Sequence, residues 1–536
     1  MRSPNEQSQK LSVIIVGGGI AGLTLANALQ HSGIDYVLLE AYSELAPQVG
    51  ASIGLSPNGS RILDQFGCYE QILSTASRID WNGSHSPDGK LIRPRTDAMQ
   101  LLKARSNYSM CFLDRQNVLQ ALADRIENSK NILLDKRVKN IFHSTDSVRV
   151  DCDDGTSYHG DIVVGADGTH SVVRKAMWRT ASLEAPGEIP ETEQGSMTAE
   201  YKCLFGISTA VSGLPSHHFD VTYIKDLTPI IITGEGDRVY WFLIARLDKV
   251  YRDKDIPRYT RQQELDFVSS HFDIPLTEDG KVRFKDVWNR RVSSRLVALE
   301  EAFFPHWTWG RFICIGDSVH KMTPNAGSGG NAAIESAASL ANSLDELIRR
   351  FPTQRPNLEE VRAALLKCQQ ERSERASSTV AMSAYVTRLH AVRGPLQRLL
   401  AYYVMPHAGD LFVDLGSLAW IGAVKINSLS LPPRSLLGTM PFNPEQGVGK
   451  SESIVYRMLW ALPLVLLGVF HLMVPPTAPK HGIWDILTGS DYPPNVWPPC
   501  GDLLWRVSGA MDFGTIYTIM LIESARRALA LTPMSL

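Results

Sequence analysis

The sequence predicts an α/β fold in which a parallel sheet carries an inserted, mainly β domain and a helical, hydrophobic C-terminal region. Apolar strand-like runs alternate with helical patterns near the N-terminus and again from residue 311. Between about residues 195 and 286 the apolar positions alternate with the period of a strand. We therefore predict a first domain built from two parts of the chain, residues 1–190 and 301–395. The inserted domain between them comprises residues 191–300, and the C-terminal region comprises residues 396–536.

Length and composition exclude several classes of protein. A chain of 536 residues suffices for two or three domains, and a net charge of −2 predicts no nucleic-acid partner. The seven cysteines are odd in number and lack CxxC spacing, which predicts neither a disulfide framework nor a metal site. Because the first ten residues are polar and no signal peptide follows, we expect the folded body to face the cytosol.

The strongest local pattern is a strand, a glycine-rich turn, a helix and a second strand. Gly17, Gly19 and Gly22 have the spacing GxGxxG. The first makes the tight turn, the second lets backbone N–H groups approach a pyrophosphate, and the third lets the helix pack on the strand. Glu40 ends the second strand, where a carboxylate binds ribose hydroxyls. This predicts a Rossmann-like, dinucleotide-binding unit.

Two later segments each leave two interpretations open. The loop from Gly50 to Gly59 contains small residues, so it either lies flat against a ligand or forms an ordinary surface turn. Arg115 lies in the first turn of a helix that we expect Asp114 to cap. A cation there opposes the helix dipole, so it either holds a ligand phosphate or is solvated.

Two further strands end in turns that suit a ligand site. A buried strand runs into Asp167-Gly168, and after the inserted domain another strand delivers Gly316-Asp317 to its carboxyl end. A glycine-rich turn then opens a helix predicted at Ala332–Leu347, which presents N–H groups to an anion or carbonyl. The other predicted elements are short strands at 131–134, 138–142, 148–152 and 157–159, sheet strands at 221–224, 230–233 and 239–245, and a long helix at 358–389.

The C-terminal region favours membrane association. Met458–Val474 has His471 as its only ionisable side chain and spans roughly 26 Å as a helix, near the lower limit for crossing a bilayer. The alternative is a buried helical core. Leu411–Val424 and Phe513–Ile522 are weaker candidates. We expect a protein attached to the endoplasmic reticulum membrane with its folded body in the cytosol.

The order of these elements resembles the single-component FAD-dependent monooxygenases of the aromatic-hydroxylase fold, over residues 11 to 390. Three segments, Pro57–Gln65, Phe112–Leu119 and His320–Asn325, are similar to fungal epoxidases of meroterpenoid and indole-diterpene pathways. Those enzymes epoxidise an alkene of a prenyl chain before a membrane cyclase folds it. The resemblance implies a farnesyl or geranylgeranyl substrate, O2, and functional coupling to a membrane terpene cyclase.

The resemblance also implies the cofactors and the site. FAD is expected to be resident and NADPH or NADH to visit, in keeping with the lack of a second strand-linked GxGxxG. Glu40 is expected at the adenosine ribose, Arg115 at the FAD phosphates, Asp317 at the ribityl chain, and Gly330 at the isoalloxazine edge. Ser328 departs from the glutamine that related sequences often have. The expected cofactor-binding residues are Gly17, Gly19, Gly22, Glu40, Gly54, Arg115, Asp167, Gly168, Asp317 and Gly330.

The substrate wall is expected to be apolar and aromatic, because water in the site would release peroxide unproductively. The inserted sheet offers Tyr223, Tyr240, Trp241 and Phe242. Tyr223 is the candidate catalytic residue, with a hydroxyl near the flavin; the alternative is a tyrosine of the core. His320 is expected to be structural, because epoxidation removes no proton.

Three rival functions remain open. A flavin halogenase shares the nucleotide domain, and Trp307-Thr308-Trp309 is similar to its tryptophan pair, although Gly310-Arg311 follows in place of Ile-Pro. A prenyl reductase would use FAD but consume no O2. A non-enzymatic prenyl-binding carrier could keep the fold without redox chemistry, and would not need bound FAD.

Overall fold

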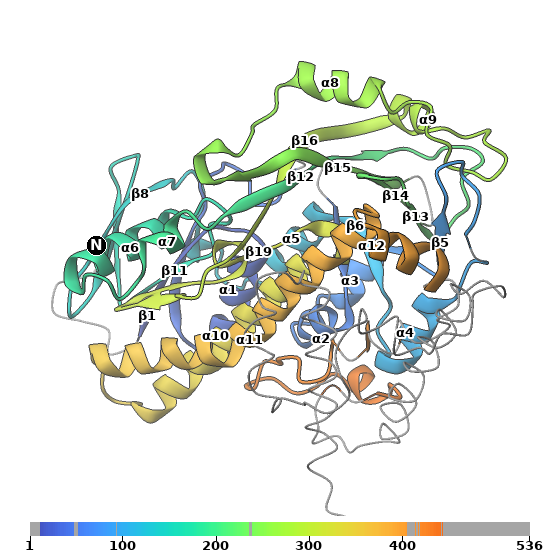
Figure 1. The fold of residues 1–536 in the computed structure, drawn as a ribbon. Helices are drawn as coiled ribbons and strands as arrows, with labels where there is room; N and C mark the ends of the chain where they lie inside the picture. Colours follow the sequence, from blue (N-terminus) through green and yellow to red (C-terminus); the bar gives the residue numbers. More distant parts are fainter. Residues whose placement is uncertain are drawn as a thin grey trace, which may run out of the picture. The chain divides into compact units, whose positions relative to one another are not determined.

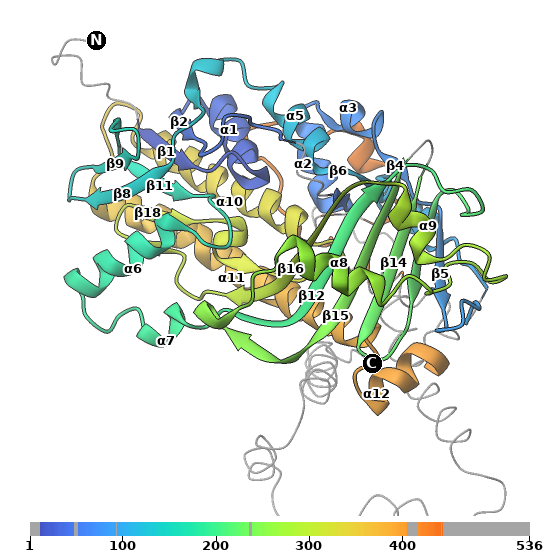
Figure 2. The ribbon, with the colours of Figure 1, turned by 90° about the horizontal axis from the view of Figure 1, so that it is seen from above.

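A computed structural model describes residues 11–47, 52–92, 94–234, 238–404, 413, 416–417, 419–440 and 442. The chain divides into two units, Met1–Gly449 and Lys450–Leu536, and all described residues belong to the first. Figure 1 shows a large sheet above the long helices α10 and α11, with a smaller parallel sheet toward the other end. Figure 2 shows the same arrangement from above.

The first sheet is mainly parallel and has the order β17-β18-β11-β1-β2-β7. β1 (Ser12–Val16) pairs in parallel with both β2 (Asp35–Leu39) and β11 (Ile162–Gly165), and β11 pairs with β18 (Phe312–Cys314). Almost all residues of these strands are buried, because α1 and α10 cover one face and α6 covers the other. The predicted parallel sheet built from two distant parts of the chain is confirmed.

The turn between β1 and α1 (Ile20–Ser32) requires glycine at two of its positions. Gly17 has φ +104°, which favours glycine, and its N–H donates to the Leu39 carbonyl. A Cβ on Gly22 would lie 1.9 Å from the Gly17 carbonyl oxygen, so only glycine lets the helix start this close to the strand. The turn consequently has no room for a side chain at either position.

The second sheet has seven strands in the order β19-β16-β12-β15-β14-β13-β5. The predicted mainly β insertion is antiparallel, but its sheet extends beyond residues 191–300. β5 (Trp81–His85) comes from the first part and pairs in parallel with β13, and β19 (His320–Lys321) comes from the third and pairs with β16. Sequence analysis missed β5, because Trp-Asn-Gly-Ser-His has little β-propensity.

The remaining elements complete the unit. The strands of the second sheet are β12 (Thr198–Ser208), β13 (His218–Thr222), β14 (Leu227–Thr233), β15 (Val239–Arg252) and β16 (Arg291–Phe303). The smaller strands are β3 (Ser52–Leu55), β4 (Ser77–Arg78), β6 (Cys111–Asp114), β7 (Ile132–Leu133), β8 (Val138–His143), β9 (Val148–Cys152), β10 (Ser157–Gly160) and β17 (Thr308–Trp309). The α-helices are α2 (Pro57–Gln65), α3 (Tyr69–Leu73), α4 (Ala98–Ser106), α5 (Arg115–Ala123), α6 (Val172–Glu184), α7 (Glu191–Gln194), α8 (Arg261–Ser269), α9 (Phe284–Asn289), α10 (Gly329–Arg350), α11 (Leu358–His390) and α12 (Pro395–Leu399).

A segment within the predicted C-terminal region belongs to the first unit. The fully buried Arg61 of α2 donates to the Ala423 carbonyl, and Gln65 donates to the Ile426 carbonyl at 2.9 Å. Residues 423–426, which fall in the region predicted from residue 396 onward, therefore pack on α2. Within the described ranges, no helix is both long and apolar enough to cross a membrane. The predicted span at 458–474 lies outside the described residues.

The Gly22 contact generates a stability prediction. Replacing Gly22 with alanine places a methyl group against a backbone carbonyl that cannot move without breaking the turn, so we expect a loss of about 1–3 kcal/mol. Thermal unfolding should show a lower Tm. Gly195→Ala is the control, because a Cβ there meets nothing within 4 Å. Equal Tm values for the two variants would contradict the close-packing argument.

Candidate functional site

A cavity of about 510 Å³ lies where the carboxyl ends of the parallel strands face the seven-stranded sheet. The turns after β1, β11 and β18 contribute Gly19, Gly168 and Asp317, as expected for ligand sites of open α/β sheets. We call its two parts the polar half and the apolar half. The polar half is lined by Gly19, Arg115, Gly168, Asp317 and Lys321. The apolar half is lined by Ile79, Met99, Met110, Phe112, Phe219, Ile230, Ile232, Phe242 and Ile244.

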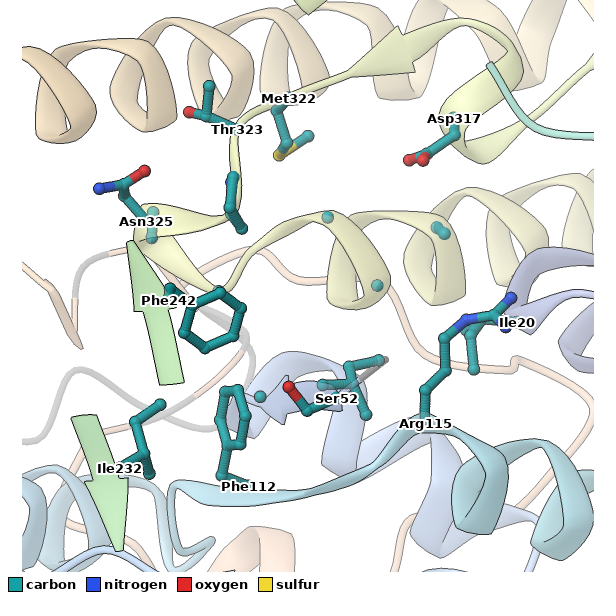
Figure 3. Close-up of a pocket in the computed structure, with 18 of the residues that line it drawn as sticks. Ile20, Ser52, Phe112, Arg115, Ile232, Phe242, Asp317, Met322, Thr323 and Asn325 are labelled. Carbon is teal, nitrogen blue, oxygen red and sulfur yellow. The ribbon is translucent and has the colours of Figure 1, made fainter. Parts of the chain in front are cut away.

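Figure 3 shows this division. Arg115 and Asp317 lie on one side of the cavity, with Ile20 beside Arg115, whereas Phe112, Phe242 and Ile232 lie on the other side, together with the polar Asn325. Six of the ten predicted cofactor-binding residues line the cavity: Gly19, Gly54, Arg115, Gly168, Asp317 and Gly330. They come from six separate elements or turns, so the fold brings together residues that are up to about 300 positions apart in the chain.

The polar half contains two cations, Arg115 and Lys321, and one carboxylate, Asp317. Lys321 donates from Nζ to Asp317 Oδ2 at 2.7 Å. Burial disfavours the Asp317 carboxylate, but Lys321, with help from Arg115, holds its pKa below the ordinary value. Burial lowers the pKa of Arg115, against the attraction of Asp317 and Glu40. Both groups are thus charged at neutral pH, and both face the cavity, where a phosphate and a polyol could meet them.

Four of the predicted cofactor-binding residues do not line the cavity: Glu40, Gly17, Gly22 and Asp167. Glu40 accepts hydrogen bonds from the backbone N–H groups of Gly18 at 2.6 Å and Tyr42 at 3.0 Å, so its carboxylate lies at the glycine turn. Asp167 accepts from the N–H groups of Val172 and Val173 at the start of α6, and burial raises its pKa. It therefore acts within the protein as a cap, and the Gly168 that follows faces the cavity.

Bare backbone forms the floor between the two halves. A Cβ on Gly330 would lie 2.5 Å from Ile53 Cδ1, and one on Gly54 would lie 3.3 Å from the Phe112 ring. α10 begins here, and its N-cap residue, Ser328, makes no side-chain capping bond, which leaves N–H groups available to an acceptor. At both glycines, Ile53 and Phe112 already occupy the space that a side chain would need, and the N–H groups of α10 are the polar groups at this part of the cavity. Together with the charged groups, these residues fit a flavin dinucleotide.

The expected substrate wall is only partly correct. Phe242 lines the cavity, whereas Trp241 points to the opposite face and packs on Phe284 and Trp288. Neighbouring residues of a strand face opposite sides, so the two could not share one wall. The Tyr240 hydroxyl donates to Asp114 Oδ1 at 2.9 Å. Asp114 is the N-cap residue of α5, as predicted, but its carboxylate makes no side-chain capping bond to the helix.

Tyr223, the predicted catalytic residue, does not line the cavity. Its side chain is 3% exposed, and its ring packs on His390 and Tyr402 with centroids 5.8 and 6.2 Å apart. β13 ends at Thr222, one residue before it, so sheet alternation does not direct this side chain toward the cavity. The structure places Tyr223 in the core, which was the alternative interpretation.

Sequence analysis missed most of the apolar half. Ile230 and Ile232 alternate with Ile231 along β14, so the period of two carried a usable signal for one face. Phe112 immediately precedes Leu113 and Asp114, and it reaches the cavity because β6 pairs with β3. The local sequence contains no signal for this pairing between distant segments.

His320 makes its contacts within the protein and does not line the cavity. It is fully buried, and Nε2 lies 2.9 Å from the Ser336 hydroxyl of α10. Burial, reinforced by the positive charge of Arg372, lowers its pKa to about 4. The imidazole is therefore neutral at physiological pH. Its placement agrees with the structural role expected from the sequence.

The fold and site match known proteins. A family model described as FAD binding domain matches residues 10–355. The chain belongs to this family. The relative verC1 of Penicillium polonicum, an FAD-dependent monooxygenase, is 40% identical over 97% of this chain and 68% of its own length. The aurC monooxygenase of Calcarisporium arbuscula is 38% identical over 85% of this chain and 93% of its own.

This FAD-dependent monooxygenase also shares its fold with solved structures. Klebsiella pneumoniae HpxO, in complex with FAD and uric acid, superposes with a TM-score of 0.62 at 20% identity, covering 79% of this chain and 98% of that one. The predicted enzyme class is thus confirmed, and so is the predicted use of FAD.

We expect Asp317→Ala to lose bound FAD. The substitution removes the carboxylate that faces the cavity and leaves Arg115 and Lys321 as uncompensated cations. The absorbance at 450 nm per mole of purified protein should fall at least ~10-fold. Replacing the exposed Asp266 of α8 with alanine is the control and should leave flavin content unchanged. Full flavin occupancy in Asp317→Ala would contradict the assignment.

The low pKa of His320 predicts that the stability of the folded protein depends on pH. Its folded pKa of about 4 lies below the ordinary 6.5, so the unfolded chain binds a proton that the folded protein excludes. Stability attributable to His320 is fully present above about pH 6.5 and is lost as the pH falls toward about 4. Between pH 7.5 and 5, the Tm of the wild type should fall by at least ~2 °C more than that of His320→Asn. Parallel Tm profiles would show that His320 does not contribute.

Proposed function

We propose that this monooxygenase epoxidises an alkene of a prenylated intermediate, with a farnesyl or geranylgeranyl chain, in fungal natural-product biosynthesis before cyclisation. The observation that carries the proposal is the gathering of nine aliphatic, aromatic and methionine side chains in the cavity wall, where Ser52, Thr323 and Asn325 are the polar neighbours. An isoprenoid chain presents the same chemistry. Its burial against these side chains would contribute about 25 cal/mol per Å² of apolar surface.

Among the described residues, no general base lines the cavity beside this apolar wall. Among the described residues that line the cavity, the ionisable groups are Arg115, Asp317, Lys321 and Cys111. The first three belong to the polar half, and burial raises the pKa of the Cys111 thiol to about 12, so it stays neutral. Oxygen transfer to an alkene removes no proton from the substrate. This supports epoxidation over reactions that require deprotonation.

The roles of the chain's own residues follow from their positions. Bound FAD supplies the oxygen chemistry, at the expense of NADPH or NADH and O2. Arg115 and Asp317 would hold the dinucleotide in the polar half, and the bare backbone of Gly54 and Gly330 would admit its ring. Phe112 and Phe242, whose rings meet edge to face at 6.1 Å, would keep water away from the alkene.

The proposal includes attachment to the endoplasmic reticulum membrane through Met458–Val474. A prenylated substrate partitions into lipid, and a membrane terpene cyclase would take the epoxide from there. Among the rivals, the halogenase has the least support. Trp307 is fully buried against His320, with ring centroids 5.5 Å apart, and does not line the cavity.

The test is product analysis under ¹⁸O2. The purified enzyme, supplied with NADPH and candidate prenylated quinols or indoles, should give a product one ¹⁸O atom heavier, with O2 consumed. A product two hydrogens heavier without O2 uptake would establish a reductase instead. A halogenated product formed only with added halide would establish the halogenase.

The apolar wall predicts how the enzyme's oxygen consumption is divided between product formation and release of H2O2. Ile232→Ala and Ile231→Ala remove the same atoms from adjacent residues, but only Ile232 lines the cavity. With substrate present, Ile232→Ala should raise the share of NADPH oxidation that produces H2O2 in place of oxygenated product at least ~3-fold, because water enters the enlarged site. Ile231→Ala should lower stability and leave that fraction unchanged. The same peroxide fraction in both variants would contradict the assigned wall.

A further inference from the structure

A segment of the chain that follows α12 lies against the helices α2, α10 and α11. We call the described residues 419–440 the docked segment. Apart from a short 3₁₀ helix at Pro433–Leu436, it has no regular secondary structure. In Figure 1 it is drawn in orange below α2. The backbone groups of such a segment find their hydrogen-bond partners mainly in neighbouring side chains.

Two amide side chains clamp the middle of the docked segment. Gln65 of α2 donates from Nε2 to the Ile426 carbonyl and accepts from the Ile426 N–H, each at 2.9 Å. Asn342 of α10 donates to the Lys425 carbonyl at 2.7 Å and accepts from the Asn427 N–H at 2.9 Å. Three consecutive residues are thus bound through their backbone, in the way that a protein binds an extended peptide.

A buried cation of α2 also binds the docked segment. Arg61 is fully buried and donates to the Ala423 carbonyl at 2.5 Å and to the Val424 carbonyl at 3.2 Å. Burial lowers the pKa of Arg61 to about 10, so the guanidinium is still charged at neutral pH. A buried charge without acceptors is costly, so the carbonyls of the segment stabilise Arg61 where it lies.

The docked segment is connected to a buried carboxylate through α11. Arg375 donates to the Ala419 carbonyl at 2.6 Å and to the Ile421 carbonyl at 3.2 Å. The same guanidinium donates to both carboxylate oxygens of Glu335, at 2.8 and 3.0 Å. Glu335 is buried and also accepts from Arg372 at 2.5 Å. Burial disfavours the carboxylate, but the two arginines hold the pKa of Glu335 below its ordinary value.

The same carboxylate is connected to the flavin cavity. Glu335 Oε1 accepts from Asn58 Nδ2 of α2 at 2.6 Å. At the start of α10, the buried Asn331 accepts from the Ser56 N–H and donates to the Gly54 carbonyl, both at 3.0 Å. Gly54 lines the flavin cavity. Helices α2 and α10 are therefore tied to the flavin cavity at their starts and to the docked segment farther along.

We propose that docking of this segment and binding of FAD are coupled, with α2 and Glu335 as the connection between them. Release of the segment takes backbone acceptors away from Arg61 and Arg375, and these guanidinium groups then compete with Asn58 for the Glu335 carboxylate. The contacts that hold the Gly54 loop against α10 weaken, and FAD binds less tightly. Glu335 and Asn58 are positioning residues, because neither lines the cavity.

The coupling works in both directions. Two binding equilibria that affect each other do so by the same factor, typically roughly 5- to 150-fold. FAD therefore holds the docked segment in place as strongly as the segment holds FAD. The coupling also gives a role to the pattern Pro57–Gln65, because Asn58 at its start contacts α10 and Gln65 at its end contacts the segment.

The first test loosens the clamp. Gln65→Ala/Asn342→Ala removes its side-chain bonds, and neither residue lines the flavin cavity. When the full chain is stripped of FAD and titrated with it, the Kd for FAD should be at least ~5-fold higher than in the wild type. Gln71→Ala/Gln120→Ala is the matched control, because these exposed amides donate to Asp124 instead, and it should leave the Kd unchanged. Equal FAD affinity in the two double variants overturns the proposal.

The second test needs no variant. Trypsin cleaves after Lys425 when the docked segment opens, so saturating FAD should slow this cleavage in the wild type at least ~5-fold. Lys281, which is 83% exposed in the inserted domain, is the reference site, and cleavage there should not depend on FAD. Mass spectrometry follows both sites. A rate at Lys425 that does not depend on FAD, or equal protection of both sites, would show that the segment is only structural.

Neither test involves a substrate or a reductant. A chain that shows the coupling but forms no epoxide would contradict the proposed function alone. A chain that epoxidises its substrate but shows no coupling would contradict this proposal alone.

Discussion

Parallel pairing of β1, β11 and β18 is the constraint on which the site depends. Three strands that start at residues 12, 162 and 312 lie side by side and end at the same edge. Their carboxyl ends place Gly19, Gly168 and Asp317 around one cavity. The register is set by strands buried on both faces, so a shift by one residue would turn buried side chains toward the wrong helices.

The parts that the sequence predicted are those that backbone geometry requires. Gly17 and Gly22 are imposed by a positive φ and a 1.9 Å approach, and such requirements restrict residue type at fixed spacing. The parts it missed depend on pairing between distant segments. β5 joins the second sheet only by lying beside β13, and Phe112 reaches the cavity only because β6 pairs with β3. Tyr223 was misplaced because an aromatic residue near a strand end fits a core and a cavity wall equally well.

The cavity keeps charge and apolar surface apart without leaving a charge unpaired. Asp317 is compensated by Lys321 and Arg115, so the polar half holds ions at a tolerable cost even when it is partly dry. The apolar half needs no such compensation, because its lining groups carry no charge. His320 lies behind this boundary as a neutral group bonded to Ser336, which fixes α10 without adding a proton donor to the cavity.

This separation bears on where a reductant can enter. A dinucleotide that carries several negative charges would lose its hydration in the apolar half and find no cation there. A pyridine dinucleotide would therefore have to reach the flavin from outside the apolar half.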